Sequence, residues 1–132
     1  MTDFSKKDQS NSGKVGASSF PNVDKLGLED IVKLANKVGL EYAAAKAESE
    51  RLELLKPTVR AKITLKLDDG NVSEVKLKRL TETHDDYVAF LEQLSEARTN
   101  CERLKVRYDS YKNLFDARRS LLSYQKAEMK LI

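Results

Sequence analysis

The residues best suited to bind an anionic ligand are seven lysines and arginines on the two sides of a turn signal, Asp-Asp-Gly-Asn at residues 68–71. Residues 56–67 contain four of these cations and no acid, and Glu74 is the one acid close to the other three. If the chain reverses at the turn, the two groups lie side by side and could neutralise several phosphates, each contact adding to the salt dependence of binding. A solvated face without a ligand is the alternative, because charged side chains mostly lie at protein surfaces. The candidate nucleic-acid-binding residues are Lys56, Arg60, Lys62, Lys66, Lys76, Lys78 and Arg79.

The sequence does not indicate an enzyme. Its one histidine, His84, and its one cysteine, Cys101, lie seventeen places apart on the same predicted helix, so they cannot meet. No group of residues has the spacing of a metal site, and no glycine-rich loop could hold a phosphate. The adjacent Asp85 and Asp86 are typical of a solvated helix face. We therefore expect no catalytic residues, no metal and no cofactor.

Length and composition indicate one helical domain. The chain has 132 residues, of which 34% are charged and 40% hydrophobic, with two prolines, five glycines and no tryptophan. The formal net charge of +3 is too small to indicate nucleic acid by itself, so that hypothesis depends on how the cations are distributed. A single cysteine allows no intrachain disulfide and fits a reducing compartment. Without a signal peptide or a run of about 18 apolar residues, we expect a soluble, cytoplasmic protein that does not enter a membrane.

The dominant pattern is a heptad repeat between Leu80 and Met129. A second apolar row follows three places after the first, and no proline or glycine interrupts either row. A strand buries alternate residues, so this period predicts one long helix from about Ser73 to the C-terminus. Fifty helical residues span roughly 75 Å, so the helix must pack against another long helix or against copies of itself. The first row is Leu80, Tyr87, Leu94, Cys101, Tyr108, Phe115, Leu122 and Met129, and the second is Phe90, Ala97, Leu104 and Tyr111.

An earlier helix is predicted after Pro21, where apolar residues again recur at threes and fours. Asp24 is a possible N-cap, and Glu29 and Asp30 would favour the helix dipole in the first turns. Residues 1–22 are rich in serine, glycine, asparagine and lysine and are predicted to form a disordered tail. Residues 23–132 then form the helical hairpin domain.

Two readings compete around Pro57. Residues 58–67 alternate cleanly and contain β-branched side chains, which together with the following turn and Val75 and Leu77 would fit a β-hairpin over residues 58–78. The other reading continues the helix through a kink at Pro57 and starts the next helix at Ser73 as N-cap. An isolated two-stranded hairpin is marginally stable in water. We therefore favour an all-α fold, a long two-helix hairpin or coiled-coil-like bundle kinked near Pro57.

The C-terminal turns show apolar surface in a second direction. Arg118 and Gln125 occupy positions that the apolar row should hold, while Leu114, Leu121 and Leu131 lie on a flanking face. This face indicates either a contact between subunits or packing of the first helix.

The layout resembles the UvsY-like family of phage recombination mediators over residues 42–132, most closely at Val59-Arg60-Ala61-Lys62-Ile63. The family has an apolar–basic–Ala–basic–apolar motif here, before a short turn and a long helix, and its two cations contribute to single-stranded DNA binding. The resemblance implies this role for Arg60 and Lys62, although arginine precedes lysine here and the turn is shorter. It also implies that the C-terminal helix forms a homo-oligomer, through Leu114, Phe115, Leu121, Leu122 and Met129.

The resemblance implies a non-enzymatic, single-stranded-DNA-binding recombination mediator that helps to load a RecA-like recombinase onto DNA covered by single-strand-binding protein. A phage-encoded chain would act in the cytoplasm of the host cell. The alternative is a structural or scaffolding coiled-coil phage protein that binds no nucleic acid. In a straight helix, Arg60 and Lys62 point about 200° apart, so either the backbone is distorted after Pro57 or the two contact DNA through neighbouring subunits.

Overall fold

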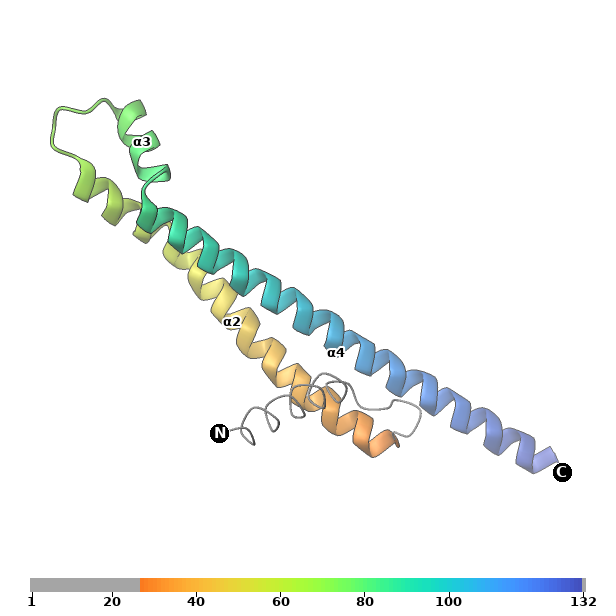
Figure 1. Cartoon of the computed structure of the whole chain (residues 1–132). Coiled ribbons are helices and arrows are strands. Elements are labelled where there is room, and N and C mark those ends of the chain that lie inside the picture. Colours follow the sequence, from red (N-terminus) through yellow and green to blue (C-terminus); the bar gives the residue numbers. More distant parts are fainter. Residues whose placement is uncertain (1–26, 132) are drawn as a thin grey trace, which may run out of the picture.

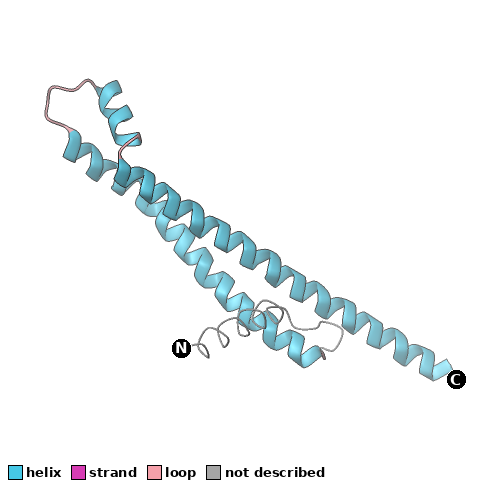
Figure 2. Ribbon diagram, viewed as in Figure 1, coloured by secondary structure: helices cyan, strands magenta, loops and turns pink. Residues whose placement is uncertain are grey.

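The computed structural model describes residues 27–131 as a long antiparallel hairpin of helices (Figure 1). Helix α2 spans Leu28–Leu67, the short helix α3 spans Glu74–Glu82, and helix α4 spans Asp85–Leu131. Residues 27–131 contain no strand (Figure 2), so the predicted all-α hairpin is confirmed. The predicted tail at residues 1–22 and the predicted cap at Asp24 lie outside the described residues.

The hairpin is held together by two facing heptad rows. In α2, the buried residues Ile31, Val38, Ala45 and Leu52 recur at every seventh position. The two predicted rows of α4 are buried or half-buried from Tyr87 to Phe115. Leu52 packs with Phe90 and Leu94, joined by the partly buried Val59 and Ala97. Burial of each large apolar side chain contributes about 1.5–3 kcal/mol, so these rows supply most of the stabilisation of the fold.

A close approach between the helices depends on Gly39. A Cβ atom at this position would lie 2.9 Å from Cε1 of Tyr108, closer than real contacts allow. The Tyr108 ring also packs against Tyr42, with 6.2 Å between ring centroids. The Lys112 Nζ lies 4.7 Å from the centroid of the Tyr108 ring. Gly39 therefore does not end α2, and it makes room for an aromatic ring of α4.

Residues 58–67 are helical, and the β-hairpin reading of residues 58–78 is wrong. Helix α2 continues through Pro57, whose ring is exposed and whose missing N–H removes one bond to the carbonyl of Glu53. Ile63 is 5% exposed. The physical reason is that Val59 packs against the core of Leu52, Phe90 and Leu94 and Ile63 is buried, whereas a two-stranded hairpin would have no sheet to join.

The predicted helix from Ser73 to the C-terminus is wrong in one respect, because it is broken at Thr83–His84 into α3 and α4. The Ser73 side chain caps α3 as expected, accepting the N–H of Lys76 at 3.3 Å. At the break, the Thr83 hydroxyl donates to the Arg79 carbonyl at 2.7 Å. His84 Nδ1 accepts the N–H of Asp86 at 3.1 Å and so caps α4. These local hydrogen bonds compete with helix continuation.

The break places Leu80 outside the heptad rows. It lies on α3 and is 40% exposed. Leu122 and Met129, at the other end of the predicted row, are 47% and 75% exposed because α4 extends past the start of α2 (Figure 1). The heptad row of the sequence therefore extends beyond the contact between α2 and α4 at both of its ends.

Replacement of Gly39 by valine tests the close approach to Tyr108. Gly39→Val should lower the free energy of unfolding by about 2 kcal/mol, because overpacking against the ring outweighs the gain in helix propensity. Urea denaturation followed by circular dichroism measures the change. Ala43→Val, one turn later and exposed, is the control and should cost only about 0.6 kcal/mol. A Gly39→Val protein as stable as the wild type would contradict the packing described.

Candidate nucleic-acid interface

The closed end of the hairpin is built around an acidic turn. Asp68 Oδ1 accepts the N–H of Gly70 at 3.0 Å, and Asp69 Oδ1 accepts the N–H of Asn71 at 2.9 Å. Gly70 has φ +84°, a conformation that suits glycine. The turn signal read from the sequence therefore connects two helices, and its carboxylates hold backbone N–H groups.

Two threonine hydroxyls dock α3 on α2. Thr81 is fully buried, and its Oγ1 lies 3.0 Å from Oγ1 of Thr64. Each oxygen is also 2.9 Å from a carbonyl of its own helix, Arg60 O for Thr64 and Leu77 O for Thr81. Because each hydroxyl has one hydrogen, one threonine donates to the other while the second donates to its own carbonyl. This contact fixes how α3 lies along α2.

An ion pair beside the threonines holds one of the predicted DNA-binding cations. Arg60 donates to Glu82 Oε1 at 2.9 Å, and the two side chains are 42% and 44% exposed. Lys62 is exposed and lies about 200° around α2 from Arg60, nearly on the opposite side of the helix. The two cations of the family motif therefore do not share a face of this chain, and α3 neutralises one of them.

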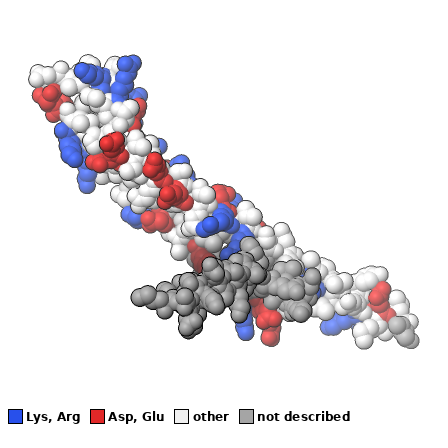
Figure 3. Space-filling view, viewed as in Figure 1, with Lys and Arg blue, Asp and Glu red and all other residues white. Residues whose placement is uncertain are grey.

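The other predicted cations divide into two groups. On α2, Lys56 is half-buried and Lys66 Nζ lies 3.8 Å from Asp86 Oδ2. On α3, three exposed cations form no ion pair inside the described part of the chain. Lys76 and Arg79 share one side of the helix, and Lys78 lies nearly opposite Lys76. Figure 3 shows Lys and Arg side chains gathered at the end of the molecule that carries α3, with acidic side chains nearby. We call the cations of α3 the α3 cluster: Lys76, Lys78 and Arg79.

The closed end can contact phosphates but offers no base-stacking platform. Residues 56–86 contain no Phe, Tyr or Trp, and the next aromatic residue, Tyr87, is 5% exposed. The seven cations of this stretch are opposed by six acids, so its formal charge is only +1. The site would therefore bind a polyanion weakly and through charge, with little preference for base sequence.

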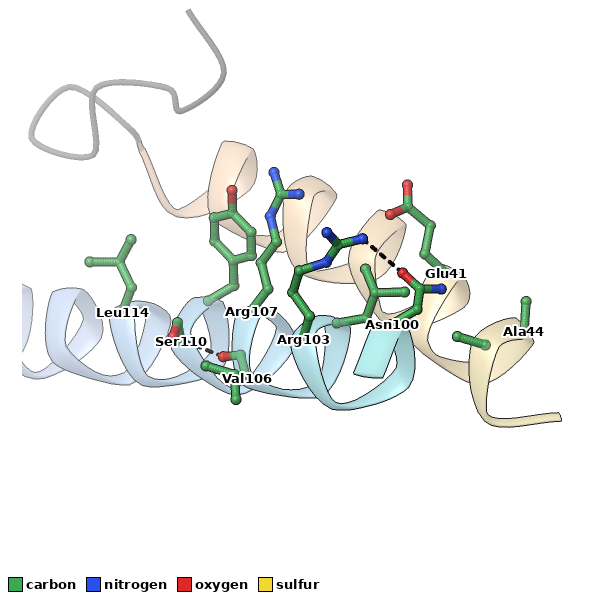
Figure 4. Close-up of a pocket in the computed structure, with 11 residues that line it drawn as sticks. Glu41, Ala44, Asn100, Arg103, Val106, Arg107, Ser110 and Leu114 are labelled. Carbon is green, nitrogen blue, oxygen red and sulfur yellow. Dashed lines mark hydrogen bonds between the residues drawn. The ribbon is translucent and has the colours of Figure 1, made fainter. Parts of the chain in front are cut away.

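A concave surface lies on the side of the hairpin, away from the closed end (Figure 4). It is a groove of about 1170 Å³ between Glu41 and Ala44 of α2 and the middle of α4, including Val106 and Leu114. Arg103 reaches across part of it and donates to Asn100 Oδ1 at 2.8 Å. Within residues 27–131 no three His, Cys, Asp or Glu side chains are grouped as metal ligands. The groove thus has a largely apolar lining that also includes polar side chains such as Arg103 and Asn100.

The predicted oligomerisation residues differ in how far they are exposed. Leu114 and Phe115 are half-buried, the first lining the groove and the second lying in the heptad row. Leu121, Leu122 and Met129 are exposed on the part of α4 that extends past α2. No described helix is long and apolar enough to cross a membrane.

No family model, curated protein or solved structure matches this chain. The relation to the UvsY-like family therefore stays a prediction that depends on the motif and the layout.

Sequence reasoning missed the residues that position the site. Thr64 and Thr81 are seventeen residues apart and Arg60 and Glu82 twenty-two, so no local spacing links them. A possible signal was the threonine at position 81, which is polar but faces α2 next to the apolar Leu77.

Truncation of Thr81 tests whether the hydroxyl contact holds α3. Thr81→Ala should destabilise the docked state of α3 by about 1–2 kcal/mol, through a lost hydrogen bond and a lost buried methyl group. Hydrogen–deuterium exchange should then be faster over residues 74–82 than in the wild type, with the middle of α4 unchanged. Thr99→Ala, on an exposed turn of α4, is the matched control. Equal exchange in α3 of both variants would show that the hydroxyl does not hold this helix.

Proposed function

We propose that the chain is a non-enzymatic protein that binds single-stranded DNA through the closed end of its hairpin. The observation that carries the proposal is the α3 cluster, three exposed cations that form no ion pair within residues 27–131, on a helix that Thr81 and Glu82 attach to α2. Phosphate contacts are the interaction available to it, because exposed lysine and arginine side chains with no stacking partner recognise backbone charge.

The resemblance to the UvsY-like family supports a more specific role as a recombination mediator. In that role the protein assists the loading of a RecA-like recombinase onto DNA covered by single-strand-binding protein. A mediator needs to hold DNA without excluding the recombinase. Weak sites that are multiplied by oligomerisation suit this requirement, because each contact can be released singly while the effective concentration keeps the assembly bound.

The expected affinity of one subunit is strongly salt-dependent. Three phosphate contacts on a single strand, at a slope of about 0.7 per contact, lower the binding constant about 20-fold between about 50 and 200 mM salt. The expected result is DNA binding that is detected at about 50 mM salt and lost at about 200 mM salt.

A structural or scaffolding role in a coiled-coil assembly is the second candidate. It is favoured by the apolar side chains that stay uncovered on both long helices, such as Leu40 and Leu54 on α2 and Tyr124 and Leu131 on α4. This candidate predicts oligomers whose size and stability do not respond to DNA.

Neutralisation of the α3 cluster tests the DNA site. The triple variant Lys76→Ala/Lys78→Ala/Arg79→Ala should bind a labelled single-stranded oligonucleotide at least tenfold more weakly at about 50 mM salt, with a shallower salt slope. Fluorescence anisotropy measures both quantities. Arg60→Ala/Lys62→Ala, the pair implied by the resemblance, should lose less, because Arg60 is already paired with Glu82.

The control for this experiment is a variant with the same charge change elsewhere. Lys33→Ala/Lys37→Ala/Lys46→Ala removes three exposed cations from the other part of α2. If both triple variants lose affinity equally, binding follows net charge, and the closed end is not a site. If the wild type fails to bind even at low salt, the scaffolding role takes precedence.

The mediator role is tested with a recombinase from the same genome. The wild-type chain should raise its ATP hydrolysis on single-stranded DNA that is already covered by single-strand-binding protein. The α3 triple variant should not, because it no longer holds the strand while the covering protein leaves. Equal stimulation by the wild type and the α3 triple variant would show that the mediator role does not depend on the α3 cluster.

A further inference from the structure

Helix α2 carries a second heptad row, most of which lies on the side away from α4, while Ala44 also lines the groove beside α4. Its members alternate by four and three residues, and every one of them is exposed. The three leucines are 75%, 79% and 76% exposed, although residues of this type are usually buried. Ala45 of the core and Leu54 of this row are nine residues apart, which places them on opposite sides of the helix. We call this row the outer row: Leu40, Ala44, Ala47, Arg51, Leu54, Thr58, Ala61 and Leu65.

The outer row has the spacing of a coiled-coil seam rather than of scattered surface residues. Its eight members alternate between four d-type and four a-type positions over more than three heptads, a length of roughly 38 Å. Pro57 and the lysines of α2 lie beside the row, and Arg51 is its one charged member. The row therefore predicts that another helix packs along the back of α2.

The order of residues in the row reads nearly the same in both directions. Around a centre between Arg51 and Leu54, Leu40 corresponds to Leu65 and Ala44 to Ala61. Ala47 then corresponds to Thr58, and Arg51 to Leu54. Each pair combines an a-type with a d-type position, as layers do in an antiparallel coiled coil. Large side chains meet large ones at the ends, and small ones meet small ones between them.

From this symmetry we infer that the outer row is the interface with a second copy of the chain, packed antiparallel about a twofold axis between Arg51 and Leu54. A twofold interface uses the same patch on both subunits, so its sequence must complement its own reverse. An unrelated partner would place no such demand on the row. The alanines and the threonine allow the two helices to approach closely, and the leucines close both ends of the seam.

Charge at the edge of the row agrees with this arrangement. In the antiparallel register, Lys62 lies beside Glu41 of the partner subunit, and the same pair recurs on the other side of the twofold axis. Arg51 is the one charged member of the row, and its guanidinium already donates two hydrogen bonds to Glu48, at 3.0 and 2.8 Å. Those hydrogen bonds lower the pKa of Glu48 and keep the pair charged. Arg51 can thus lay its aliphatic stem against the seam with its charge already neutralised.

Disulfide trapping tests the interface and its register. In chains carrying Cys101→Ser, one preparation carries Ala44→Cys and another carries Ala61→Cys. After mixing and mild oxidation, a covalent dimer should form between the two variants, because these positions face each other in the proposed dimer. Each variant alone should form little covalent dimer. Self-linkage of each variant alone would indicate a parallel seam, and absence of any linkage would indicate no seam; either result overturns the proposal.

Two further variants show which surface carries the association. Leu54→Glu should abolish the trapped dimer and lower the mass measured by sedimentation, while its helix content is unchanged because position 54 is 79% exposed. Val106→Glu, at a 64% exposed position lining the groove on α4, should leave both unchanged. If Val106→Glu disrupts the trapped dimer and Leu54→Glu does not, the groove is the interface and the inference is wrong.

Discussion

The packing of α2 against α4 is the constraint on which the rest of the structure depends. Helix α3 has nine residues, too few for a helix to be stable in water without tertiary contacts. Its contacts are Thr81 with Thr64 and Glu82 with Arg60, and both partners lie in the last turns of α2. Those turns are in turn held by Ile63, the last buried residue of α2. The α3 cluster is therefore presented to solvent by a chain of contacts that begins at the heptad rows.

The heptad rows were also the part of the fold that could be predicted from sequence. Tyr87, Leu94 and Tyr108 recur at multiples of seven residues over many turns, and a single long helix is the simplest structure with that period. The break at Thr83–His84 could not be predicted, because the apolar period passes across it through Leu80 without a change of phase. It is caused by short-range hydrogen bonds from Thr83 and His84, which periodicity does not report.

The sequence predicted which cations form the candidate site, but not how they are arranged. The sequence placed all seven cations on the two sides of one turn, and the structure places that turn at the closed end of the hairpin. Which cations act together depends on long-range partners. Glu82 pairs with Arg60 and Asp86 lies near Lys66, whereas the three cations of α3 form no ion pair within residues 27–131. At Pro57 the favoured helix was confirmed, and beyond it Val59 packs on the core of Leu52, Phe90 and Leu94 while Ile63 is buried.

In an antiparallel pair of hairpins, the proposed dimer interface fixes the distance between the two proposed DNA sites. If the twofold axis passes between Arg51 and Leu54, the C-terminal ends of the two α2 helices lie about 45 Å apart, at 1.5 Å per residue. One α3 cluster then lies on each side of the twofold axis, and the two cannot contact adjacent phosphates. A single strand must extend over on the order of ten nucleotides to reach both, at about 3.4 Å per nucleotide. Shorter strands engage one weak site, whereas longer strands gain the second at high effective concentration. A pair of hairpins joined in this way would distinguish strands by length while reading no base.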